Sequence, residues 1–143
     1  MRWSTSSDHR TWAPAPLEIG SGVDPDDIAS IVAFGGNRVG VVWSDQVTAR
    51  VCFRVHNDSD PPTTWQPLEI VRSSWGCVDD HLNMKADSHG RVYLAAKDWF
   101  DAVWVGRRDT DGTWTVTTGA SGLDCGTRPI LQIDEGTNKL YVF

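Results

Sequence analysis

The chain has 143 residues, a formal net charge of −6, eight tryptophans and three cysteines. The negative charge and the lack of a lysine or arginine run argue against a nucleic-acid partner, because binding to phosphates requires a basic surface. There is no run of about 18 apolar residues that could span a membrane. Three cysteines without a CxxC pair favour neither a disulfide framework nor a zinc site.

Strand patterns follow one another along the chain, and no segment shows sustained helical periodicity, so the expected fold class is all-β. Residues 1–20 are predicted to hold two outer strands and their turn. Two groups of four strands follow, at Ile28–Phe34, Arg38–Ser44, Ala49–His56 and Trp65–Val71, and then at His81–Asp87, Arg91–Lys97, Ala102–Arg108 and Thr113–Thr118. The segment Thr127–Phe143 supplies two more strands. The short loop Ser88–Gly90 predicts a hairpin.

These groups are copies of one repeat. Thr-Trp occurs at Thr11-Trp12, Thr64-Trp65 and Thr113-Trp114, and Pro-Leu-Glu-Ile begins at both Pro16 and Pro67. A period of roughly 40 to 50 residues with about four strands per unit is typical of a β-propeller blade. The predicted organisation is therefore one partial propeller domain, 1–143, of four-stranded antiparallel blades. Its parts are the outer strands of one blade at 1–20, complete blades at 27–71 and 80–118, and the inner strands of another at 127–143.

About three blades cannot close a ring, because propellers need at least about four. We therefore expect the chain to be a fragment of a longer propeller, or to complete its ring with a second copy. The edge Lys139–Phe143 is apolar and has little to block association. On its own, the chain is expected to dimerise or aggregate.

The tryptophans fall into two groups. Trp12, Trp65 and Trp114 recur at one repeat position, which predicts burial between sheets. Trp75, Trp99 and Trp104 do not recur and are the better candidates for exposed platforms. Among the cysteines, Cys52 is expected to be buried as a small hydrophobe. Cys77 and Cys125 lie at nearly equivalent places, where a disulfide and two free thiols both remain open.

Two turns carry a resemblance to a known family. Ser6–Trp12 and Asp109–Trp114 are similar to the S-x-D-x-G-x-T-W turn of Asp-box (BNR) repeats, so the chain resembles sialidase-like β-propellers. The segment Arg128-Pro129-Ile130 is similar in position to the R-I-P motif of sialidases, without the residue between arginine and proline. The resemblance implies a six-bladed parent that is extracellular or periplasmic, although no signal peptide is recognisable after Met1.

The repeat also aligns the residues that would face a propeller's central channel. Asp27, Asp80 and Thr127 share one column, and Ile28, His81 and Arg128 share the next. The predicted ligand-binding residues are Asp27, Asp80, His81, Asn83, Lys85 and Arg128. Arginine suits a carboxylate, and aspartate or histidine can accept sugar hydroxyls or move a proton. The alternative is that the Asp pairs only turn the crossovers and that Lys85 pairs with a carboxylate.

The leading functional hypothesis is a module that binds a glycan or another polar ligand at the channel mouth, with no catalytic residues assigned. The alternatives are part of an exo-acting, sialidase-type glycoside hydrolase, and a structural or protein-binding propeller. No cofactor or metal is predicted, because the turn Asp109–Gly112 lacks the other ligands of a calcium loop and favours a plain β-turn. The expected partners are the ligand and either the remaining blades of the parent or a second copy.

Overall fold

The structure is a computed structural model that describes residues 2–13, 17–20, 23–79, 81–118 and 128–143. Within these ranges every regular element is a β-strand, which confirms the all-β prediction, and no helix there could cross a membrane. The strands are β1 (Arg2–Trp3), β2 (Leu17–Glu18), β3 (Ala29–Phe34), β4 (Arg38–Asp45), β5 (Arg50–Asn57), β6 (Glu69–Ser73), β7 (Leu82–Ala86), β8 (Val92–Lys97), β9 (Val103–Arg108), β10 (Trp114–Thr118), β11 (Leu131–Asp134) and β12 (Lys139–Val142).

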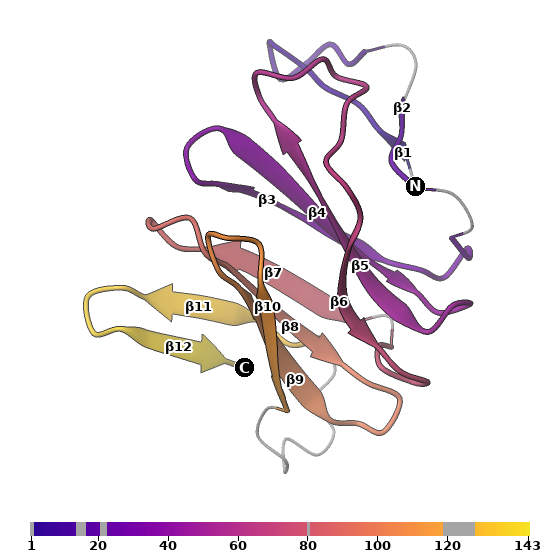
Figure 1. Ribbon diagram of the computed structural model, residues 1–143, viewed down its shortest axis with the longest axis vertical. Helices are drawn as coiled ribbons and strands as arrows, with labels where there is room; N and C mark the ends of the chain where they lie inside the picture. Colours follow the sequence, from indigo (N-terminus) through magenta and orange to yellow (C-terminus); the bar gives the residue numbers. More distant parts are fainter. Residues whose placement is uncertain (1, 14–16, 21–22, 80, 119–127) are drawn as a thin grey trace.

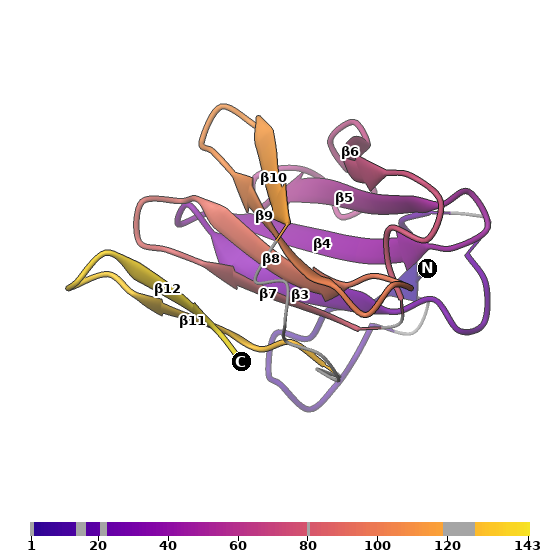
Figure 2. The same ribbon diagram turned by 90° about the horizontal axis from the view of Figure 1, so that it is seen from below.

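The strands form four antiparallel sheets. The first sheet has the order β3-β4-β5-β6 and the second β7-β8-β9-β10, while β1 pairs with β2 and β11 with β12. The sheets succeed one another along the molecule (Figure 1). The first strands of successive sheets, β3, β7 and β11, lie side by side, with β6 and β10 on the opposite side (Figure 2).

Strand positions agree closely with the sequence patterns, and β6 is the main departure. It begins at Glu69 rather than Trp65. The backbone amide of Gln66 still donates to the carbonyl of Val55 (2.8 Å), so the two segments are already adjacent there. Pro67 has no N–H to donate, which delays the regular ladder with β5. The predicted hairpin loop Ser88–Gly90 is present, with Gly90 at a positive φ of 82° that suits glycine.

The main core lies between the first and second sheets. It is built from alternating residues of both, among them Phe34, Phe53, Met84, Leu94 and Trp104. A smaller cluster of Ile19, Val41, Trp43 and Cys52 lies on the other face of the first sheet. Both faces of the first sheet are therefore apolar, as expected for a sheet covered on two sides.

A glycine in β4 makes room for the core. A Cβ built on Gly40 would lie 2.5 Å from Cζ of Phe53, closer than side-chain carbons approach. Any larger residue would displace the Phe53 ring from the centre of the core, so this position requires glycine for close approach rather than for backbone conformation.

A charged tie joins β6 of the first sheet to β9 and β10 of the second. Arg108 of β9 donates from Nε and Nη2 to the carboxylate of Glu69 on β6, at 2.8 and 2.7 Å. The indole N–H of Trp114 donates to the same carboxylate at 2.8 Å. The Arg108 guanidinium also lies over the rings of Phe34 and Phe53. The guanidinium of Arg108, which is buried at the edge of the core, therefore has both a carboxylate partner and aromatic contacts.

The two Asp-containing turns close through their aspartates. The carboxylate of Asp8 accepts hydrogen bonds from Ser6, from the amide of Arg10, and from the amide and hydroxyl of Thr11. These bonds, led by the Thr11 amide, hold the pKa of Asp8 well below its usual range. Asp111 accepts from the amide of Thr113 at 2.9 Å in the corresponding place.

The tryptophan predictions are corrected in part. Trp114 packs against the main core and Trp65 against the smaller cluster, but both are half-buried rather than largely buried. Trp12 is exposed, because none of the described strands packs against its ring. Trp104 was expected at the surface and is fully buried. The Trp104 side chain points from β9 into the core, and its indole N–H donates to the carbonyl of Cys77 at 2.8 Å. The exposure predicted for Trp75 and Trp99 is confirmed.

Cys52 is buried as predicted, and burial, followed by the charge of Asp45, raises the pKa of its thiol to about 11. Cys77 is also buried with a free thiol, and Cys125 lies outside the described residues, so their pairing stays a prediction.

Candidate functional site

The residues that precede or begin β3, β7 and β11 line a single pocket. Its volume is about 370 Å³, and it is lined by Ile28, His81, Leu82, Asn83, Arg128, Pro129 and Ile130. We call it the inner-strand pocket. Ile28, His81 and Arg128 occupy the same position in three successive repeats, so the structure brings together the column that the alignment predicted.

Asn83 hydrogen-bonds to the backbone of a neighbouring strand, and His81 lies beside a carboxylate. The side-chain oxygen of Asn83 accepts from the amide of Leu131 at 3.0 Å, which ties β7 to β11. The ring Nδ1 of His81 lies 3.8 Å from a carboxylate oxygen of Asp79. That carboxylate also pairs with Lys97 at 3.4 Å, and Lys97 pairs with Asp101 at 2.7 Å. The hydrogen bond to Asp101, more than the charge of Asp79, raises the pKa of Lys97.

Arg128 is presented to the pocket in a strained conformation. Its φ is 69°, in the left-handed region that costs a residue with a Cβ about 1 to 2 kcal/mol. Such strain gathers at functional sites. The Arg128 side chain is exposed, and none of the ion pairs among the described residues includes its guanidinium.

The other predicted site residues do not line this pocket. The Asp27 carboxylate accepts from Ser44, from the amide of Gln46 and from the amide of Asp24, so it turns the crossover before β3. This is the structural role given above as the alternative for the Asp pairs. Lys85 is exposed on β7 outside the pocket lining. Asp80 lies outside the described residues.

An exposed aromatic cluster lies on the second sheet's connections. Trp75, Trp99 and Phe100 form what we call the aromatic patch, in which Trp75 is 71% exposed. Trp75 meets Trp99 edge to face, with centroids 5.3 Å apart, and lies 5.8 Å from Phe100. Below them, the buried carboxylate of Asp98 accepts from the amides of Phe100 and Ala102 (both 3.0 Å), which fixes the turn.

The aromatic patch and the inner-strand pocket lie at the same end of the second sheet. The amide of Asp79 donates to the carbonyl of Lys97 at 2.8 Å, and the amide of Lys97 donates to the carbonyl of His81 at 3.0 Å. The turn after β8, which carries Trp99, is therefore at the end where β7 begins. Trp75 and Trp99 were predicted from the sequence to be exposed, but Phe100 was not. An apolar residue inside an aspartate-flanked turn was the signal that could have identified it.

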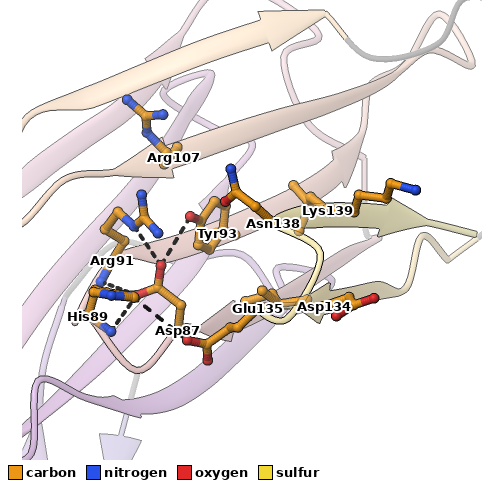
Figure 3. A pocket seen from close by; sticks show the side chains of 11 residues that line it. Asp87, His89, Arg91, Tyr93, Arg107, Asp134, Glu135, Asn138 and Lys139 are labelled. Atoms are coloured by element: carbon orange, nitrogen blue, oxygen red, sulfur yellow. Dashed lines mark hydrogen bonds and ion pairs between the residues drawn. The ribbon is translucent and has the colours of Figure 1, made fainter.

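A second, smaller pocket lies at the opposite end, between the β7–β8 and β11–β12 hairpins (Figure 3). Its volume is about 250 Å³. It centres on the buried carboxylate of Asp87, which accepts from the amides of His89 and Arg91, from Nε of Arg91 and from the hydroxyl of Tyr93. Ser88 bonds to Glu135 and links the two hairpins. Repeat alignment marked the Asp87 and Arg91 positions but not this network.

The Asp87 network should make stability depend on pH. Burial opposes ionisation of Asp87, but the hydrogen bonds and charge from Arg91 outweigh it and place the pKa below its usual range. A depressed folded-state pKa contributes stability above the unfolded value, about 3.9, and loses it as pH falls below that. We expect Asp87→Asn to lower the free energy of unfolding by about 2 to 3 kcal/mol at pH 7.

Denaturant melts between pH 2 and pH 7 would measure this effect. The difference between wild type and Asp87→Asn should shrink at the acid end, where both side chains are uncharged. The control is Asp26→Asn, which removes an exposed carboxylate and should change stability by less than about 0.5 kcal/mol. A pH-independent difference for Asp87→Asn would show that the ionised network is not what stabilises this end of the sheet.

Comparisons with known proteins give no match, so the site is interpreted from its own residues. No family model matches the chain, no curated protein matches it, and no solved structure matches it. Among the described residues, no group of three or more histidine, cysteine, aspartate or glutamate side chains is placed to hold a metal ion.

Proposed function

We propose that this chain is part of a β-propeller that binds a glycan carrying a carboxylate at the mouth of its central channel. One observation carries the proposal: Ile28, His81 and Arg128, from equivalent positions in three successive repeats, line one pocket. In a propeller the first strand of each blade faces the channel, so the starts of β3, β7 and β11 would form part of its mouth.

The pocket chemistry suits an acidic sugar. The guanidinium of Arg128 can donate two parallel hydrogen bonds to a carboxylate. His81 and the amide of Asn83 can exchange hydrogen bonds with hydroxyl groups. Ile130 adds an exposed apolar side chain that can contact the C–H groups of a sugar ring. The volume of about 370 Å³ lies in the range of small-ligand sites, about 300 to 1,000 Å³.

The aromatic patch supports a ligand longer than one sugar. Exposed indole rings bury large apolar area at little conformational cost, which suits the C–H face of a pyranose. The Asp101 carboxylate in the same turn is exposed and can accept hydrogen bonds from hydroxyls. Because the patch and the pocket lie at the same end of the second sheet, one oligosaccharide can reach from Arg128 toward Trp99.

The test is an NMR titration with glucuronic acid and, in parallel, glucose, which differ by the carboxylate. We expect glucuronate to shift the signals of His81, Asn83 and Arg128, and glucose to bind at least about tenfold more weakly. Arg128→Gln should lower the affinity for glucuronate about tenfold or more and leave glucose unaffected.

Lys85→Gln is the matched control, because it removes the same charge from an exposed position outside the pocket. It should leave both affinities unchanged. Equal binding of the two sugars, or equal losses in Arg128→Gln and Lys85→Gln, would show that Arg128 does not recognise a carboxylate.

A further inference from the structure

The two small sheets have complementary, uncovered surfaces, and we propose that they join two copies of this chain head to tail. In this arrangement β12 of one copy pairs with β1 of the other, and the β11–β12 pair packs on the open face of β3. The proposal depends on strand pairing and burial rather than on the proposed ligand, and Ile130 is the one residue that both proposals use.

The first observation is that residues at one position of the repeat are buried in two sheets and exposed in the third. The strand registers place Ile31, Met84 and Leu131 at equivalent points, since they pair with Val41, Leu94 and Val142 respectively. Met84 is 4% exposed and Leu131 is 0% exposed, because each faces the preceding sheet. Ile31 is 66% exposed, because no four-stranded sheet among the described residues covers this edge of the first sheet. The face of β3 that carries Ile31 is therefore an unfilled sheet-to-sheet contact.

The second observation is a matching face on the β11–β12 pair. The backbones of Ile130 and Phe143 bond to each other in both directions, and Gln132 pairs with Tyr141, so these four residues share one face. Ile130, Tyr141 and Phe143 are all exposed, and the rings of Tyr141 and Phe143 stack. In the first sheet the equivalent face of β3 packs against β7 and buries Phe34 in the core. The face on β11–β12 should accept a neighbour in the same way.

The third observation is that the two small sheets are complementary halves of one unit. The Asp8 turn with Thr11-Trp12 joins β1 to β2, as the Asp111 turn with Thr113-Trp114 joins β9 to β10, the third and fourth strands of the second sheet. The pair β11–β12 matches the first and second strands. Among the described elements, β1 pairs only with β2 and β12 only with β11, so each has an open edge. Joining β12 to β1 completes a four-stranded sheet.

A cavity marks where the partner enters. It has a volume of about 440 Å³ and is lined by both β1 and the first sheet, including Trp3, Ile31, Val41 and Trp65. The indole N–H groups of Trp3 and Trp65 are buried and have no acceptor among the described residues. The repeat-equivalent indole of Trp114 finds its acceptor on the neighbouring sheet, at Glu69. The cavity is bordered mainly by apolar and aromatic side chains of β1 and the first sheet, so it can accept apolar side chains of a partner.

A second copy is the occupant that meets every requirement at once. It carries both the apolar face of β11–β12 and the open edge of β1, and each contact repeats one that already exists inside the chain. The contact is heterologous, because it joins two different surfaces of the chain. The dimer is closed when β11–β12 of each copy contacts β1 and β3 of the other, so that the contact occurs twice. In that dimer each small sheet is completed to four strands by the other copy.

Light scattering after gel filtration at micromolar concentration tests the proposal. The wild type should elute as a species of twice the 15.8 kDa chain mass. Ile31→Lys places a charge in the centre of the contact and should weaken association at least about tenfold. Val47→Lys makes the same change at a side chain that is also 66% exposed, in the β4–β5 turn away from the contact, and should remain dimeric.

Mixing variants distinguishes the head-to-tail contact from other dimers. Tyr141→Lys alters the partner face and should also weaken association when it is alone. A mixture of Ile31→Lys and Tyr141→Lys should recover dimers, because one of the two contacts then has wild-type residues on both sides. Both changes are at exposed positions, so circular dichroism should match that of the wild type. A wild-type monomer, a dimer unaffected by Ile31→Lys, or no recovery on mixing would each overturn the proposal.

Discussion

Replacing Trp104 with alanine should lower the free energy of unfolding by about 3 to 5 kcal/mol. Its side chain is fully buried between the first and second sheets, and its N–H donates to the carbonyl of Cys77 at 2.8 Å. The Arg72 guanidinium lies over the ring, 5.2 Å from its centroid. The substitution would leave a large cavity and an unpaired carbonyl at the centre of the molecule, and denaturant melts at neutral pH would measure the loss.

Trp99→Ala is the matched control for this experiment. It removes the same side chain from the exposed aromatic patch and should cost no more than about 1 kcal/mol. Trp104→Phe should fall in between, because it keeps most of the buried area but loses the hydrogen bond to Cys77. Equal losses for Trp104→Ala and Trp99→Ala would mean that the second sheet does not pack on the first as described.

Glu69→Ala should also strongly destabilise the fold, by about 3 kcal/mol. Glu69 is the only acceptor described for the side-chain Nε and Nη2 of Arg108 and for the Trp114 indole. Arg108 has a side chain only 8% exposed, so removing the carboxylate would leave a buried cation without its anion. Because Glu69 is on β6 and Arg108 on β9, the change should loosen the contact between the two large sheets on this side of the molecule.

The ion pair between Arg107 and Asp109 provides the comparison. Both of its side chains are substantially exposed, and Asp109→Ala should cost less than about 1 kcal/mol. Replacing Glu69 and Arg108 together, as Glu69→Gln with Arg108→Met, should recover part of the stability, since no buried charge is then left unpaired. Chemical denaturation of the three variants would measure both effects. If Glu69→Ala costs no more than Asp109→Ala, the tie does not hold the sheets together.

Local patterns in the sequence were enough to place the strands. Alternation along Leu82–Ala86, the loop Ser88–Gly90 and the repeated Thr-Trp positions each involve residues close together in the chain, and the observed strands follow them to within a few residues. The same alignment placed Ile28, His81 and Arg128 in one column. They line one pocket in the structure, because equivalent positions of successive repeats occupy equivalent places when the sheets stack.

The environment of individual side chains was decided by the tertiary structure. Trp75 and Trp104 are both tryptophans outside the repeat markers, yet one is exposed and the other fully buried, because only Trp104 lies on a strand face that meets another sheet. The sequence did not predict that Ser44 and Gln46, brought near Asp27 by the β3–β4 pairing, donate hydrogen bonds to its carboxylate. Periodicity along a strand indicates which residues share a face. Which face is covered, and which charges meet there, depends on residues from distant parts of the chain.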